Sequence, residues 1–223
     1  MLNLFLTYAV GLLAFLSLAL GIYSILVNPK SLVVKLWFLL SLAIGAWSGN
    51  LFLLMHSGQI QSAAILYSKL LHVGASFIPV LFCHFVLYFA LQYGNKKKIV
   101  FLYAGYILAI VFALLSLTPL IVAGASPKIG FSFWVDAGKL YPWLLIYFWV
   151  YVLATLYFLF QGYQNTGGVM KTKTFYLLIA SIVAFASGGT SFLPQTLGIY
   201  PFGDFITWLY PIIVTYGIFI KDR

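Results

Sequence analysis

The sequence predicts an all-α polytopic membrane protein, a single domain over residues 1–223 that forms a bundle of seven transmembrane helices. Hydrophobic residues make up 64% of the chain and charged residues only 7%, whereas soluble domains carry about 25% charged residues. Apolar runs of about 20 residues, the length that crosses a bilayer, recur along the whole chain. We therefore expect the lipid bilayer to be a partner of this protein.

Polar links divide the chain into seven apolar segments. The expected spans are residues 4–27, 34–55, 64–92, 99–123, 141–160, 174–193 and 204–220. The first run has no basic segment before it and is too long for a signal-peptide core, so we expect it to remain as a span. Between the fourth and fifth spans, the alternation of residues 129–135 is compatible with a small hairpin at the membrane surface.

The basic residues predict the orientation. Nine of them fall on one side of the predicted membrane: Lys30, Lys35, Lys96, Lys97, Lys98, Lys171, Lys173, Lys221 and Arg223. The other side holds three, together with two acids: Lys69, Lys128, Lys139, Asp136 and Asp204. The positive-inside rule then places the N-terminus outside and the C-terminus in the cytoplasm. This placement explains the net charge of +9 without a nucleic-acid partner.

Several residues inside the spans have two interpretations. His84 must face the bundle, where a hydrogen bond to a neighbouring helix is a plainer expectation than a catalytic role. Pro79 and Pro211 are expected to bend their helices, as structural features or as hinges. His72 and His84 lie about 18 Å apart along one predicted helix, so they cannot bind one ion together. A pair of His56 and His72 is left open, but we expect no metal and no cofactor.

The segment between the last two predicted spans, residues 194–203, is dense in small and helix-breaking residues, and we call it the corner. Gly188 and Gly189 end a series of small residues whose spacing lets two helices approach closely. The corner itself is marked by Pro194, Pro201 and Gly203. Asp204 opens the last span, either as the N-cap of its helix or as a ligand-binding residue.

Several functions of seven-helix proteins are excluded because the residues that they require are absent from this sequence. A retinal protein needs a lysine in the last span, and residues 205–220 contain none. Ion-coupled transporters usually place acids inside their spans, but this chain has no glutamate and its three aspartates lie in links or at helix ends. No serine, cysteine or aspartate nucleophile has a paired base in sequence. We therefore expect no enzymatic activity.

Three stretches together carry a family resemblance. The first is KLLHVGASFIPVLFCHFVLYF, residues 69–89, and the second runs from Phe133 to Tyr147, with a Trp, Gly138 and Tyr141. The third contains the corner and parts of the spans on either side of it, and it is the most specific: Gly188, Gly189, Phe192, Leu193, Pro194, Gly198, Tyr200, Pro201, Gly203, Tyr210 and Tyr216. In these stretches the chain resembles the N-terminal seven-transmembrane sensor region of bacterial membrane histidine kinases, and the resemblance covers nearly its whole length.

The resemblance implies an input module of a two-component system in the bacterial plasma membrane. Such regions precede a cytoplasmic signalling domain, commonly a dimeric kinase, whereas this chain ends at Arg223. We expect a kinase or other output domain either in the same polypeptide or as a separate partner, and a homodimer is left open.

The expected signal is an apolar or amphipathic small molecule, or a change in the membrane itself, read by the outer half of the bundle. The candidate lining consists of Trp47, Asn50, Tyr141, Phe192, Tyr200 and Asp204. Movement of the last helix would then carry the signal to the cytoplasm through residues 221–223. The alternative is a small membrane transporter or a subunit that assists assembly of a membrane complex.

Overall fold

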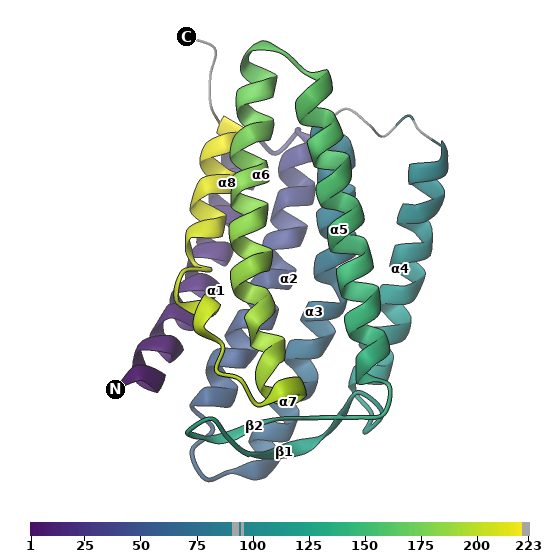
Figure 1. The fold of residues 1–223 in the computed structure, drawn as a ribbon. Helices are drawn as coiled ribbons and strands as arrows, with labels where there is room; N and C mark the ends of the chain where they lie inside the picture. Colours follow the sequence, from purple (N-terminus) through teal and green to yellow (C-terminus); the bar gives the residue numbers. More distant parts are fainter. Residues whose placement is uncertain (91–93, 95, 220–223) are drawn as a thin grey trace.

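The computed structural model describes residues 1–90, 94 and 96–219, and it shows a bundle of long helices closed at one end by a β-hairpin (Figure 1). In chain order the elements are α1 (Leu2–Val27), α2 (Leu32–Met55), α3 (Gln61–Phe89), α4 (Lys96–Ser116), β1 (Val122–Lys128), β2 (Phe131–Ala137), α5 (Tyr141–Asn165), α6 (Gly168–Gly188), η1 (Gly189–Phe192), α7 (Leu193–Leu197), η2 (Phe202–Phe205) and α8 (Leu209–Phe219). We call the end that carries β1, β2, α7 and residues 56–60 the hairpin end.

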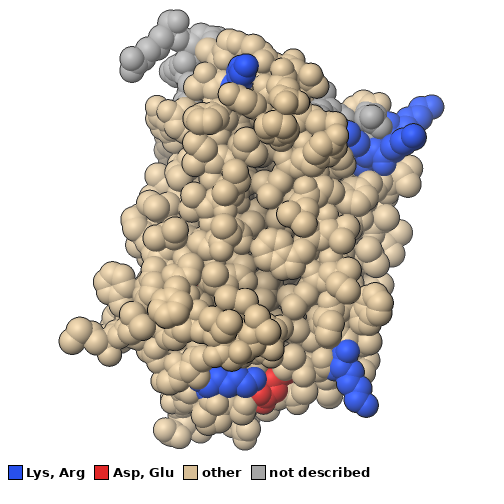
Figure 2. All heavy atoms as spheres, in the orientation of Figure 1, with Lys and Arg blue, Asp and Glu red and all other residues tan. Residues whose placement is uncertain are grey.

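The surface of the bundle fits a bilayer. Among the described residues, six helices are long and apolar enough to cross a membrane, the sixth being α6 continued through α7, and α8 is a shorter apolar helix. Large apolar side chains such as Phe15, Ile107 and Leu153 are exposed on the outside of the bundle. On the face drawn in Figure 2, charged side chains lie at the two ends, and the broad band between them shows none.

The helix α3 forms the centre of the core. It packs against α2, α4 and α5 and buries most of its length. The crossing with α2 is a direct backbone approach, because a Cβ on Gly74 would lie only 2.8 Å from the backbone nitrogen of Trp47. Near Pro79, the hydroxyl of Tyr147 donates to the carbonyl of Ser76 at 2.9 Å, in the turn that the proline loosens.

The fourth predicted span is wrong at its end. Instead of continuing to residue 123, α4 stops at Ser116, and Val122–Lys128 forms β1 paired antiparallel with β2. The hairpin was expected only from the alternation of residues 129–135. Its tip, Ile129-Gly130, has φ values of 48° and 82°, and this left-handed turn suits the glycine. Within the described part of the chain, the bundle is therefore all-α except for this two-stranded cap.

The corner before the last helix also differs from the prediction. Beyond Gly188, the sixth helix tightens into η1 and continues as α7, and α8 begins at Leu209 rather than at Asp204. Pro211 therefore lies in the first turn of α8, where a missing N–H is harmless and no bend is required. The other span boundaries moved by a few residues: α3 begins at Gln61, α5 reaches Asn165 and α6 begins at Gly168. The predicted tail, residues 221–223, and the last residues of the predicted third span, 91 and 92, lie outside the described part of the chain.

Candidate ligand-binding site near the hairpin end

An apolar cavity of about 50 Å³ lies inside the bundle, between its middle and the hairpin end. Six helices, the segment η1 and Thr207 before α8 line it: Leu13, Leu40, Ile44, Trp47, Ala75, Ile78, Phe148, Ala184, Phe185, Gly188, Gly189, Phe192, Thr207 and Tyr210. The hollow exists because small residues face it from α3 and α6. A Cβ added to Gly188 would lie 3.3 Å from the Thr207 methyl carbon, so the glycine keeps the two segments close. Tyr210 places the start of α8 in the cavity wall.

A second, smaller hollow of about 10 Å³ adjoins the first, because Trp47 and Phe192 line both. Its wall carries a larger share of polar side chains than the first: His72 from α3, Ser191 from η1 and Gln195 from α7. The hairpin covers it with Trp134 and Val135. An apolar and a polar compartment thus share two aromatic side chains.

A buried chain of hydrogen bonds runs beside the smaller hollow. The indole Nε1–H of Trp134 donates to Gln195 Oε1 at 2.6 Å, and Gln195 Nε2 donates to the Tyr141 hydroxyl at 2.6 Å. The Tyr141 hydroxyl lies 3.4 Å from His72 Nε2, and His72 Nδ1 lies 2.7 Å from the Ser68 carbonyl. Because the indole only donates and the carbonyl only accepts, one direction of donation satisfies every link, with the His72 proton on Nδ1.

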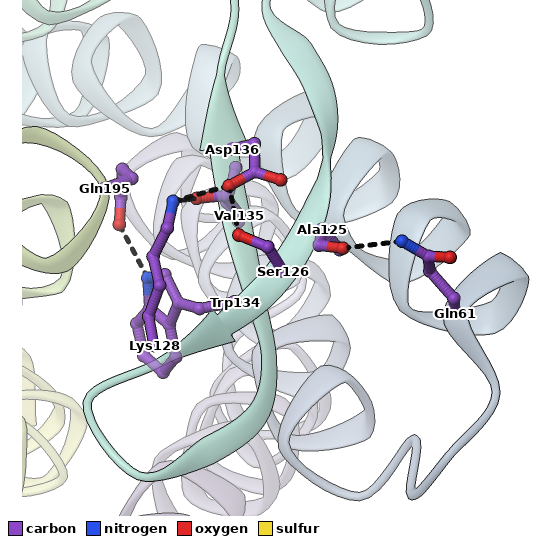
Figure 3. Close-up of polar contacts among 8 residues, drawn as sticks. All are labelled: Gln61, Ala125, Ser126, Lys128, Trp134, Val135, Asp136 and Gln195. Carbon is purple, nitrogen blue, oxygen red and sulfur yellow. Dashed lines mark hydrogen bonds and ion pairs between the residues drawn. The ribbon is translucent and has the colours of Figure 1, made fainter.

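A few polar contacts brace the hairpin and hold it beside these hydrogen-bonded side chains (Figure 3). Gln61 Nε2 donates to the Ala125 carbonyl at 3.0 Å, which ties β1 to the start of α3. Across the strands, Asp136 accepts from Ser126 at 2.6 Å and pairs with the Lys128 ammonium at 2.7 Å. The Trp134 side chain points toward Gln195 of α7, so the hairpin and the corner are directly linked.

The hairpin ion pair is expected to contribute little to stability. Both side chains are partly exposed, at 25% for Lys128 and 33% for Asp136, so water and salt screen their attraction. The substitution Asp136→Asn should lower the free energy of unfolding by less than about 1 kcal/mol. Equilibrium unfolding in mild detergent at low and high salt measures this, and a loss of several kcal/mol at both would contradict the prediction.

Short side-chain contacts attach the segment before α8 to the end of α6. Ser187 and Thr207 share a hydrogen bond of 2.8 Å, and the Gly203 N–H donates to Thr190 Oγ1 at 3.1 Å. Ser191 donates to Asp204 Oδ2 at 2.5 Å. The Asp204 side chain is only 2% exposed, and its Oδ1 has no hydrogen-bond partner among the described residues. Burial without a cationic partner favours the neutral carboxylic acid.

The comparison with known families shows which family the chain belongs to. A family model described as the N-terminal 7TM region of histidine kinase matches residues 9–220. The chain belongs to this family. No curated protein matches the sequence. The protein is therefore a seven-transmembrane sensor region of the histidine-kinase type, and the cavity, the hydrogen-bonded chain and the corner all lie within the matched residues.

The structure of this sensor region brings together some of the predicted ligand-binding residues. Trp47 and Phe192 line both hollows, and Tyr141 joins the hydrogen-bonded chain beside the smaller one. Asn50 donates to the Ala46 carbonyl of its own helix at 2.7 Å and lines neither hollow. Tyr200 packs its ring 4.9 Å from that of Phe202, outside the lining of both.

The residues predicted to shape the sensor region are placed as follows. His84 lies 2.8 Å from the Tyr106 hydroxyl on α4, which confirms the expected bond to a neighbouring helix. Asp204 does not cap the last helix, because α8 begins five residues later; it is buried against Ser191 instead. The corner residues begin or precede short helices or fill close contacts: Gly188, Gly189, Pro194, Pro201 and Gly203.

Sequence reasoning missed the partners that complete the site. Gln195, Trp134 and Thr207 were not selected, and His72 was considered only as a metal ligand. A signal was available for two of them, because a histidine and a glutamine inside or beside apolar runs must find hydrogen-bond partners. The pairing itself depends on the hairpin and α7, which sequence periodicity did not define.

Proposed function

We propose that this sensor region detects an apolar or amphipathic molecule, or a change in the surrounding bilayer, through the cavity, and passes the signal to a cytoplasmic output domain through α8. The observation that carries the proposal is the composition of the cavity wall. Gly188 and Gly189 from the end of α6 face Thr207 and Tyr210 from the last segment across the same hollow. Whatever fills the hollow therefore acts on the position of α8 relative to α6.

The last segment of the chain, which includes Thr207 and α8, has two properties suited to passing on a signal. It is held to α6 by individual side-chain bonds, such as Ser187–Thr207, rather than by a continuous helix. Further along, α8 stays packed on α6, because Tyr176 and Tyr216 meet at 5.3 Å between ring centroids and Lys173 donates to the Ile218 carbonyl at 3.3 Å. A ligand that fits two arrangements of this segment unequally would shift their populations.

The proposal places the hairpin end outside the cell and the end of α8 toward the cytoplasm of a bacterium. The nine basic residues of the links and tail support this orientation by the positive-inside rule. The output domain would be a histidine kinase, in the same polypeptide or as a separate protein. A homodimer would bring two copies of α8 to two kinase subunits.

A cavity-filling substitution tests the proposal. Ala184→Val adds two methyl groups to the cavity wall and should abolish the response to apolar compounds, because the added side chain occupies the space that a ligand needs. The measurement is autophosphorylation of a kinase core fused after Arg223, in liposomes, against a panel of apolar compounds. The matched control is Ala186→Val, on the same helix but exposed on its outer face.

The two variants separate the possible outcomes. Loss of response in Ala184→Val with a normal response in Ala186→Val supports the cavity as the input site. An equal response in both variants would remove the cavity from the mechanism. Protein-dependent flux of a solute across the same liposomes, without kinase output, would favour the transporter alternative instead.

A further inference from the structure

The two adjoining hollows restrict the chemistry of the ligand. We infer that it is a compact, uncharged amphiphile, with a hydrocarbon body in the apolar cavity and one hydrogen-bonding group in the smaller hollow beneath the hairpin. This inference rests on the proposed function and names the class of molecule that the same site would take.

The large hollow accepts hydrocarbon and little else. Apart from the Trp47 indole, its polar side chains are Thr207 and Tyr210, and the Thr207 hydroxyl is already engaged with Ser187 at 2.8 Å. A polar group placed there would lose its hydrogen bonds to water without replacement, which is costly in a buried site. At about 50 Å³ the hollow is a third of the size of a cavity of about 150 Å³ that binds benzene. The body must therefore be small, or Phe192 must turn to make room.

The small hollow can hydrogen-bond a ligand. The Ser191 hydroxyl donates its hydrogen bond to Asp204 Oδ2, so its oxygen keeps lone pairs that can accept a hydrogen bond. The Gln195 amide has a second N–H beyond the one used for Tyr141, and it can donate to a ligand oxygen. A hydroxyl group both donates and accepts, so it matches this pair of partners.

Charge is disfavoured in the same hollow. Among the residues that the structure describes, its wall contains no Lys, Arg, Asp or Glu, and the direction of donation along the hydrogen-bonded chain leaves His72 neutral. An ammonium or carboxylate would be taken out of water without a counter-ion in the wall, at a cost of several kcal/mol. The nearest acid that the described contacts connect to this hollow is Asp204, one hydrogen bond away behind Ser191.

Trp47 and Phe192 line both hollows, so one molecule would reach both compartments when these two side chains move apart. Both rings are nearly buried, at 7% and 6% exposure, and they form the partition between the hollows. A ligand with its body on one side and its polar group on the other would contact the start of α8 through Tyr210 and the hairpin through Trp134. It would thus couple the outer cap to the last helix.

The test uses four probes with the same fluorinated four-carbon tail: 1-fluorobutane, 4-fluoro-1-butanol, 5-fluoropentanoate and 4-fluorobutylammonium. Binding to the full chain in nanodiscs is measured by ¹⁹F NMR, and the signal from Ala184→Val nanodiscs is subtracted so that partition into lipid cancels. We expect the alcohol to bind about tenfold more tightly than the fluoroalkane, the increment of one net hydrogen bond, and the two ions to show no site-specific binding. Ser191→Ala and Gln195→Met should each reduce the preference for the alcohol while leaving fluoroalkane binding in place.

Each result has a defined meaning. Equal binding of the alcohol and the fluoroalkane would overturn the amphiphile inference and leave the apolar site of the proposed function intact. Tighter binding of the ammonium probe would also overturn it and would point to Asp204 as a charged partner. If no probe distinguishes the wild-type chain from Ala184→Val, both the inference and the proposed role of the cavity fail.

Discussion

Replacing Gly203 by alanine is expected to destabilise the sensor region by about 3 kcal/mol. A Cβ at this position would lie 2.4 Å from the Ser187 carbonyl oxygen and 2.5 Å from the Ser187 Cα, both of which belong to the backbone of α6. Since neither atom can rotate away, the segment before α8 would have to separate from α6. The measurement is the free energy of unfolding in mild detergent.

A second glycine provides the control. Gly49→Ala in α2 would place its Cβ no closer than 4.0 Å to a neighbouring atom, the Ala14 Cβ. Because alanine is the better helix former, this variant should be neutral or more stable by about 0.5–1 kcal/mol. Similar losses in both variants would show that the close contact between Gly203 and Ser187 is unimportant.

The substitution Tyr141→Phe is expected to lower the free energy of unfolding by about 2 kcal/mol. It removes the hydroxyl that lies between Gln195 and His72, in a position only 1% exposed. The Gln195 N–H and the His72 Nε2 would then lack this partner in a region from which water is largely excluded. Tyr157→Phe on the exposed face of the same helix is the matched control and should change the free energy of unfolding little.

A double-mutant cycle shows whether the chain acts as a unit. Combining Tyr141→Phe with Gln195→Leu should cost less than the sum of the single losses, because the second change removes a group that the first had left unpaired. Additive losses would contradict a continuous chain from the hairpin to α3.

The membrane fold could be predicted from the sequence because each long helix carries its own signal. Apolar length and basic links defined α1 and α2 to within two residues, and α1 ends at Val27, just before Asn28-Pro29. The hairpin and the last helix could not be predicted in the same way. Residues 117–123 are apolar enough to extend a span, and only pairing with β2 draws Val122 onward into a strand.

The candidate site was predicted in part for a related reason. Trp47 and Phe192 were selected as candidate lining in the outer half of the bundle, and both do line the cavity. Asp204 was placed at a helix start that does not exist, since the segment before Leu209 is held by side-chain bonds that no periodicity reveals. The partners of Tyr141 come from two other elements, α3 and α7, so their meeting is a property of the folded chain.

Under the proposed mechanism, the size of the cavity would limit the signal that packing alone can transmit. An unfilled hollow of 50 Å³ lowers stability by about 1.2 kcal/mol at about 24 cal/mol per Å³. A ligand that fills it in one arrangement of α8 only can bias the two arrangements by about that amount through packing, roughly an eightfold change in their ratio. Filling the cavity alone would therefore make the sensor region a graded regulator of its output, and a complete switch would need the additional hydrogen bonds beneath the hairpin.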